Sequence, residues 1–144
     1  MGDLATYDRI AVASAPHECK ELGRAVTPFI PAKWDAVACE VAKSAMLQKF
    51  RSVAGLDEML LATGNRVIAR MDSNDRIWGT GLDPGHADAS RPERWRGTNL
   101  LGWALMEARA TIQADRDSSM NELPARGQPA AGVSAGGSHF MSIL

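Results

Sequence analysis

A chain of 144 residues is long enough to form one folded domain with a hydrophobic core. Its 16 basic and 17 acidic residues give a net charge of −1. A chain with this charge has no long-range electrostatic attraction to nucleic acid, which argues against a protein that coats DNA or RNA. No apolar run approaches the ~20 residues of a membrane-spanning helix, and the amino terminus carries acidic residues where a signal peptide would be basic. We therefore expect a cytoplasmic protein, with a nuclear location as the other option, that binds neither membranes nor nucleic acid in general.

Helical periodicity dominates the first half of the sequence. Apolar residues at helical spacing predict a helix over residues 3–13, and Pro16 opens a second helix that ends near Gly23. Residues 32–52 give the strongest helix prediction, because neither glycine nor proline interrupts their periodicity. We expect this long helix to be the central packing element. Its predicted buried side carries Trp34, Val37, Ala38, Val41, Ala45 and Gln48, with Met46 and Phe50 beside it.

The second half combines a short helix, a strand-like run, a loop and a last helix. Residues 56–63 have helical character and the β-prone residues 67–71 predict a strand, so the expected fold class is α+β and helix-rich. Residues 82–96 are polar and contain prolines, which predicts a loop that could fold over a site. A last helix is expected over residues 97–115. Gly, Ala, Ser and Pro dominate residues 116–144, where we expect a disordered tail.

The residues best suited to chemistry gather between Asp72 and Gly81, directly after the predicted strand. In this stretch, D-S-N-D-R-I-W-G-T-G, Asp75 offers a carboxylate for ribose hydroxyls or for a proton. Trp78 offers a flat stacking face, and the glycines that begin with Gly79 allow a backbone to approach a ligand closely. A tight turn that buries one tryptophan would give the same pattern. The stretch alone therefore leaves a binding role and a purely structural role open.

Two further groups are suited to holding a phosphate. Residues 97–99 would present free backbone N–H groups at the start of the last helix, which favours an anion there. Lys20 and Arg24 lie four residues apart on one helix face and could add positive charge. The alternatives are a solvated basic face for this pair and a helix cap for Asn99. Lys49 is either a pocket cation or a partner of the dipole of the long helix.

Together these pieces resemble the NADAR (YbiA-like) family, in order from about residue 8 to residue 113. Each of the family's motifs is weak alone, whereas six in the right order at compatible spacing are specific. The matching residues are Ala13 and Pro16 with Lys20, Leu22, Gly23 and Arg24; Trp34 and Asp35; Lys49 and Phe50; Leu60, Leu61, Thr63 and Gly64; Asp75, Trp78, Gly79 and Gly81; and Gly97, Asn99, Leu101, Gly102, Leu105, Met106 and Arg109.

The resemblance implies one compact, helix-rich α+β domain over residues 1–115 with N-glycosidase activity. Members of the family cleave the bond between a ribose carbon and a base nitrogen, in early riboflavin-pathway intermediates or in ADP-ribose attached to guanine. That chemistry requires no metal and no other cofactor, and the ligand would be a small nucleotide or an ADP-ribosylated base. The resemblance implies a catalytic role for Asp75. For substrate binding it implies Lys20, Arg24, Lys49, Trp78, Gly79, Gly81, Gly97 and Asn99.

Two departures from the family pattern concern carboxylates. The family domain opens with a β segment and an E-H-x-x-x-x-x-K-F stretch, which have no counterpart here, so the helices would expose apolar surface that a partner could cover. The family also carries a glutamate seven residues after the threonine of L-L-x-T-G, where this chain has Arg70. Glycosidic cleavage uses negative charge near the sugar. A catalytically impaired module that binds ADP-ribose or another nucleotide, and a truncated remnant without function, are therefore the alternatives to an enzyme.

Overall fold

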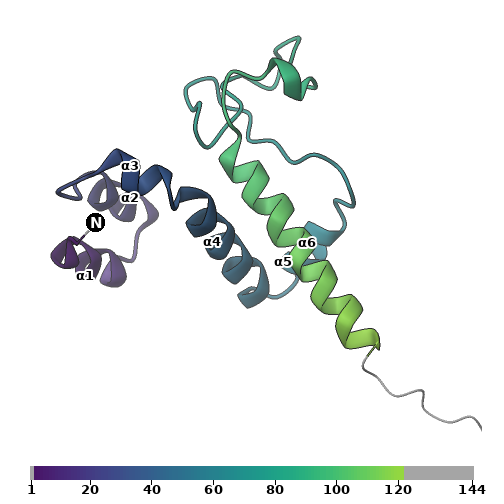
Figure 1. The fold of residues 1–144 in the computed structure, drawn as a ribbon, viewed down its shortest axis with the longest axis horizontal. Helices are drawn as coiled ribbons and strands as arrows, with labels where there is room; N and C mark the ends of the chain where they lie inside the picture. Colours follow the sequence, from purple (N-terminus) through teal and green to yellow (C-terminus); the bar gives the residue numbers. More distant parts are fainter. Residues whose placement is uncertain (1, 122–144) are drawn as a thin grey trace, which may run out of the picture.

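The computed structural model describes residues 2–121, which form helices joined by loops (Figure 1). The elements in chain order are α1 (Leu4–Val12), α2 (Pro16–Arg24), α3 (Pro31–Asp35), α4 (Ala38–Ser52), α5 (Leu56–Leu61), the short 3-10 helix η1 (Pro92–Arg94) and α6 (Leu100–Asn121). The prediction of a helix-rich fold is confirmed, whereas residues 2–121 contain no strand, so the β part of the predicted class is not found there. No helix in that range has the length and apolar character that crossing a membrane requires.

Helices α4 and α6 form the centre of the fold and run in the same direction (Figure 1). Ion pairs join Lys43 to Glu107 and, further along both helices, Arg51 to Asp115. Because the two helices are parallel, residues 53–99 return the chain from the end of α4 to the level of its start, where α6 begins. This return path contains the stretch that the sequence singles out.

Small side chains let the two central helices approach closely. Ala38 and Ala42 of α4 pack with Leu100 and Ala104 of α6 in one buried cluster. Alanines four residues apart lie on the same face of a helix, and they leave room for the ridge of a partner helix. A second cluster continues along the same helices and includes α5. Its buried members are Leu60, Ala108 and Ile112.

The long helix predicted over residues 32–52 is interrupted. Residues 36 and 37 separate α3 from α4, and Val37 has a φ of −121°, outside the helical region. The buried face agrees with the predicted one at Ala38, which is buried, and differs from it at the valines. Val37 and Val41 are 45% and 47% exposed, whereas Ala42 is buried, because close packing against α6 selects the face with the smallest side chains. A partner that covers the exposed valines stays a prediction.

The run predicted as a strand, residues 67–71, has no partner strand within the described part of the chain, residues 2–121. The side-chain amide of Asn99 takes that partner's place: its Oδ1 accepts from the N–H of Arg70 and its Nδ2 donates to the carbonyl of Ile68, both at 2.9 Å. The carbonyl of Arg70 accepts from the N–H of Thr80, also at 2.9 Å. Since these groups are satisfied locally, the run lies along the start of α6 and forms no sheet.

Helix α6 extends to Asn121, beyond the end predicted near residue 115. Arg116 forms an ion pair with Asp57 of α5, which holds the added turns against the neighbouring helix and keeps the pKa of the Asp57 carboxyl below its ordinary value. Residues 116–121 are therefore helical and do not belong to a disordered tail. The remainder of the predicted tail lies outside the described residues.

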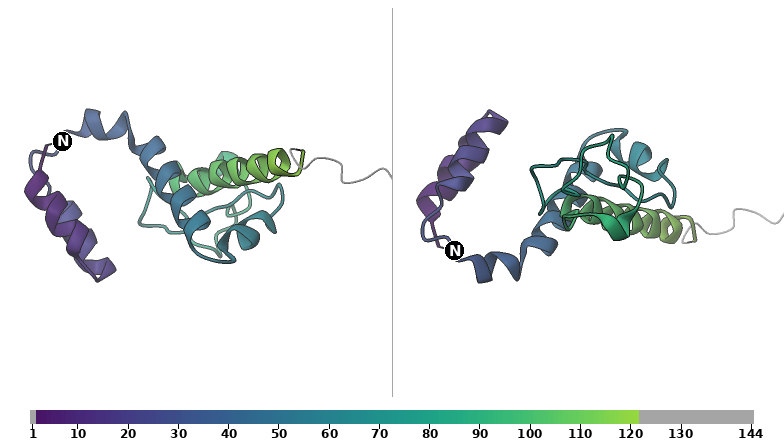
Figure 2. Two further views of the ribbon diagram at one scale, coloured as in Figure 1. Left: turned by 90° about the horizontal axis from the view of Figure 1, so that it is seen from below. Right: turned by 90° about the horizontal axis from the view of Figure 1, so that it is seen from above.

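Helices α1 and α2 form a hairpin that stands apart from the other helices of residues 2–121 (Figure 2). The carboxylate of Asp3 accepts from the N–H of Thr6 at the start of α1 and from the N–H of Thr27 after α2, each at 3.0 Å. These bonds tie the two ends of the hairpin together. Lys20 and Arg24 of α2 face the loop over residues 70–78 across one cavity.

Candidate functional site

A polar groove lies between α2, the loop over residues 70–78 and the start of α6. It has a volume of about 800 Å³ and is open to solvent. The residues that line it are Lys20, Arg24, Arg70, Asp72, Asn74, Asp75, Trp78 and Leu101. Four residues singled out in the sequence, Lys20, Arg24, Asp75 and Trp78, therefore meet in one place although they come from distant segments.

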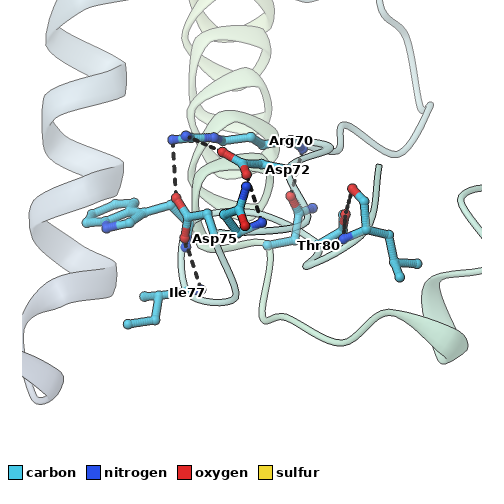
Figure 3. Close-up of polar contacts among 9 residues, drawn as sticks. Arg70, Asp72, Asp75, Ile77 and Thr80 are labelled. Atoms are coloured by element: carbon cyan, nitrogen blue, oxygen red, sulfur yellow. Dashed lines mark hydrogen bonds and ion pairs between the residues drawn. The ribbon is translucent and has the colours of Figure 1, made fainter. Parts of the chain in front are cut away.

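Both oxygens of the Asp75 carboxylate have partners (Figure 3). Oδ1 accepts from the N–H of Ile77 at 3.1 Å and from the N–H of Trp78 at 2.8 Å, which closes the turn between these residues. Oδ2 lies 3.4 Å from Nη1 of Arg70. The Asp75 side chain is only 21% exposed. The carboxylate with the expected catalytic role is thus engaged by the protein itself.

Arg70 joins the two carboxylates of the groove. Its Nη2 donates to Oδ2 of Asp72 at 3.0 Å while Nη1 faces Asp75 (Figure 3). The N–H of Asn74 and the Arg70 guanidinium hold the pKa of Asp72 below its ordinary value, and Lys20 adds a smaller contribution. Asp72 is therefore ionised at neutral pH and acts as a fixed negative charge rather than as a proton donor.

An apolar pocket of about 540 Å³ adjoins the groove. It is lined by Gly23, Arg24, Val26, Phe29, Trp34 and Trp78. Arg24 and Trp78 border both cavities, and the ring centroids of Trp34 and Trp78 lie 6.4 Å apart with their planes at 51°. A charged subsite thus adjoins an apolar subsite with aromatic walls, an arrangement that suits a ligand with one flat ring and one polar end.

The start of α6 is not the free phosphate seat that the sequence predicts. Its backbone N–H groups donate at 2.9–3.2 Å to carbonyl oxygens of the preceding loop, in the pairs Thr98 to Arg76, Asn99 to Gly79, Leu100 to Ile77 and Leu101 to Trp78. An anion at a helix start needs N–H groups that are free. Because this loop already caps the helix, the positive charge for an anion has to come from side chains of the groove.

The expected binding residues Gly79, Gly81, Gly97 and Asn99 lie behind the groove and not on its lining. Asn99 is 4% exposed, and its amide is taken up by backbone groups of the preceding extended run. A Cβ at Gly97 would lie 2.7 Å from the carbonyl oxygen of Arg76, which is too close for a side chain. These four residues support the loop that carries the groove, and a contact with a ligand stays an untested prediction for them.

Lys49 and the predicted lid lie away from the groove lining. Lys49 is exposed in the last turn of α4, where a cation interacts favourably with the helix dipole. The loop over residues 82–96 closes on itself, since Nε1 of Trp95 donates to the carbonyl of Ala89 at 3.0 Å. No residue of that loop lines the groove.

Sequence reasoning missed the apolar pocket and the arrangement of the groove's acids. Phe29 stands in a loop and carries no pattern that would indicate a pocket wall. Asp72 has a usable signal, because an aspartate two residues before Asn74 is typical of a turn that its carboxylate closes. The sequence marks Arg70 only as a departure from the family pattern, since its pairing with both carboxylates depends on the path of the loop.

Comparisons with known proteins agree on one family. The NADAR domain matches residues 1–113. The chain is 35% identical over 113 residues to N-glycosidase R617 of Acanthamoeba polyphaga mimivirus, which covers 78% of this chain and 66% of that protein. It is 32% identical over 111 residues to N-glycosidase Npun_R5314 of Nostoc punctiforme, with 77% and 64% covered. It is 29% identical over 109 residues to N-glycosidase YbiA of Escherichia coli, with 76% and 61% covered.

The chain spans slightly less than two thirds of the length of each of these relatives. Within the matched range, the six motifs lie on the hairpin of α1 and α2, on α3, α4, α5 and α6, and on the loop that carries Asp75 and Trp78. The chain therefore belongs to the NADAR domain family.

Proposed function

We propose that this chain is an N-glycosidase-type domain that cleaves or recognises a ribosyl or ADP-ribosyl base. The candidate substrates are an early intermediate of riboflavin biosynthesis and ADP-ribosylated guanine. Family membership supports the reaction class, and three of the relatives are named N-glycosidases. The observation that carries the proposal is the groove itself, in which cations of α2 and carboxylates of the 70–78 loop face one cavity.

The two adjoining cavities suggest how such a ligand lies. The base would stack on Trp78 at the border of the apolar pocket, because an indole presents a flat face to a ring. The ribose would then lie in the polar groove near Asp72 and Asp75. Lys20 and Arg24 would bind charged groups attached to the sugar.

The carboxylates supply what the transition state needs. Hydrolysis breaks the bond between the ribose carbon and the base nitrogen, with the electron pair leaving on the base. The oxygen of a water molecule binds the ribose carbon, and one proton of that water ends on the base nitrogen. The sugar passes through a state with oxocarbenium character, which nearby negative charge stabilises. The ionised Asp72 and the carboxylate of Asp75 provide that charge on the loop side of the groove.

The release of free base tests the proposal. The purified protein is incubated with a panel of phosphorylated and ADP-ribosylated ribosyl bases, and the free base is measured by chromatography. We expect Asp75→Asn to lower the rate on the order of 100-fold, since the amide keeps an acceptor for the turn but removes the charge. Asp83→Asn, an exposed aspartate outside the groove, should retain the wild-type rate. Release of no base from any panel member would end the enzymatic proposal.

A binding module without turnover is the second candidate. It is favoured by the state of Asp75, because the loop backbone holds Oδ1 and the Arg70 guanidinium pairs with Oδ2, which lowers the negative charge that the carboxylate presents to a sugar. This candidate predicts that an ADP-ribosylated guanine nucleoside binds saturably and that the bound ligand is recovered intact after prolonged incubation. Recovery of free base or of a new sugar product would exclude it.

A further inference from the structure

We infer that Arg70 determines the specificity of the groove: its guanidinium binds a phosphate group carried next to the ribose and, in doing so, releases Asp75 from the ion pair that masks it. This inference rests on the proposed function, because it concerns the ligand of the same groove. On this inference, the residue at which the chain departs from the family pattern is the residue that selects the substrate.

The backbone of Arg70 is fixed on both sides. Its N–H donates to Oδ1 of Asn99 at 2.9 Å, and its carbonyl accepts from Thr80 at the same distance. Asn99 in turn belongs to the start of α6, so Arg70 is anchored to the central helix pair. The side chain is 43% exposed and reaches the groove above Asp72 and Asp75 (Figure 3). A fixed backbone with an accessible guanidinium is what a recognition residue requires.

The guanidinium retains unused donors. Nη2 is bound to Asp72 and Nη1 faces Asp75, whereas Nε has no partner within residues 2–121. A guanidinium carries more N–H groups than these two contacts occupy, and its fork matches the oxygens of a phosphate. An anion can therefore make its first contact with Arg70 while both carboxylates are still paired, and compete with them for the guanidinium afterwards.

The charges of the groove favour an anionic ligand. Its lining carries the cations Lys20, Arg24 and Arg70 against the carboxylates Asp72 and Asp75, an excess of one positive charge. Within residues 2–121, Lys20 and Arg24 form no ion pair, so their charge is available to a ligand. A phosphate brings up to two negative charges and several strong acceptor oxygens. The backbone N–H groups at the start of α6 do not compete for this phosphate, because they already donate to carbonyl groups of the preceding loop.

The two ion pairs of Arg70 differ in length, and this difference determines which carboxylate is released first. The contact with Asp72 is a hydrogen bond of 3.0 Å, whereas the contact with Asp75 is longer at 3.4 Å. A phosphate that competes for the guanidinium displaces the weaker partner first. Asp72 then keeps Arg70 in place while Oδ2 of Asp75 becomes free to face the ribose. A ribosyl base without a phosphate leaves Asp75 masked and should be a poor ligand and a poor substrate.

Calorimetric titration with ribose 5-phosphate, ribose and inorganic phosphate tests the recognition step. We expect the wild type to bind ribose 5-phosphate at least about tenfold more tightly than ribose, and Arg70→Met to reduce this ratio to about threefold or less. Arg76→Met removes a neighbouring exposed arginine that does not line the groove, and it should keep the wild-type ratio. Unfolding midpoints of both variants close to that of the wild type show that the fold is intact. An unchanged ratio in folded Arg70→Met overturns the inference.

The rate of base release tests the unmasking step. The most active member of the substrate panel is compared with its dephosphorylated form. We expect added inorganic phosphate to accelerate cleavage of the dephosphorylated form by the wild type at least about threefold, because the phosphate frees Asp75. Arg70→Met should cleave that form faster than the wild type and show no acceleration. If phosphate accelerates the variant as much as the wild type, unmasking through Arg70 is wrong.

The two measurements separate this inference from the function on which it rests. If no panel member is cleaved, the proposed hydrolysis fails, and the binding ratio of Arg70→Met still decides whether Arg70 recognises the phosphate. If bases are cleaved but neither the ratio nor the acceleration depends on Arg70, the hydrolysis stands and the specificity role of Arg70 is excluded.

Discussion

Asn99 connects the first turn of the central helix to the groove. Its amide satisfies the N–H of Arg70 and the carbonyl of Ile68 at the same time, as a neighbouring strand would. The residue has a φ of 50°, a left-handed conformation that asparagine tolerates better than most residues. The position of the Arg70 backbone, and with it the direction of the guanidinium, therefore depends on one buried side chain.

Asn99→Ala should destabilise the fold by about 2–4 kcal/mol, because it leaves two backbone groups without partners and forces alanine into a left-handed conformation. Asn99→Gly removes the same amide but relieves the backbone, so it should recover roughly 1 kcal/mol of that loss. Chemical denaturation of the three proteins measures both steps. Asn65→Ala, an exposed asparagine, is the control and should be nearly neutral. Equal stability of Asn99→Ala and the wild type would show that the amide contributes nothing.

At the scale of the elements, the loop over residues 76–81 contacts both α6 and the two cavities. One side caps α6 with its carbonyl groups, and the other carries Trp78 into the border between the two cavities. Glycines make this possible: a Cβ at Gly97 would meet the carbonyl oxygens of Gly79 and Arg76, and a Cβ at Gly102 would meet the carbonyl of the adjacent extended run. Gly97 and Gly102 of the last motif thus have a packing explanation in this chain that involves no ligand.

Gly97→Ala should cost at least about 1–3 kcal/mol, because the added methyl group overlaps backbone atoms that side-chain motion cannot move aside. Gly85→Ala is the matched control, since a Cβ at Gly85 meets no atom within 4 Å. It should be neutral or slightly stabilising, by up to about 1 kcal/mol, through reduced freedom of the unfolded chain. Thermal unfolding of the two variants measures the difference. A Gly97→Ala protein as stable as Gly85→Ala would refute the close approach of the loop to α6.

The same elements show what the sequence could and could not predict. Helical periodicity located α1, α2, α5 and the beginning of α6, because local spacing of apolar residues determines a helix face. The periodicity did not predict the break at residues 36 and 37. It also did not predict that Ala42 is buried, because this burial follows from close contact with α6. The strand prediction at residues 67–71 failed for a related reason: β-prone residues form a strand only where a partner strand exists, and Asn99 satisfies the backbone there.

At the scale of the whole molecule, the groove depends on how the hairpin of α1 and α2 meets the loop before α6. The motifs identified Lys20, Arg24, Asp75 and Trp78 one by one, and the fold brings them together. The ion pairs of Arg70 and the occupied N–H groups of α6 could not be predicted, since both depend on a return path that has no regular secondary structure. The matched range covers only 66% and 64% of the length of two relatives, and a partner that covers the exposed Val37 and Val41 stays a prediction.

We propose that the groove and the adjoining apolar pocket form one nucleotide site bordered by Trp78. Calorimetric titration of the wild type and of Trp78→Ala with ADP-ribose tests it most directly, with Trp95→Ala, a tryptophan outside both cavities, as the control. We predict saturable binding to the wild type and to Trp95→Ala, and binding to Trp78→Ala that is weaker by about tenfold or more because a stacking face is lost. No heat from the wild type, or equal affinities of the wild type and a folded Trp78→Ala, would contradict the account.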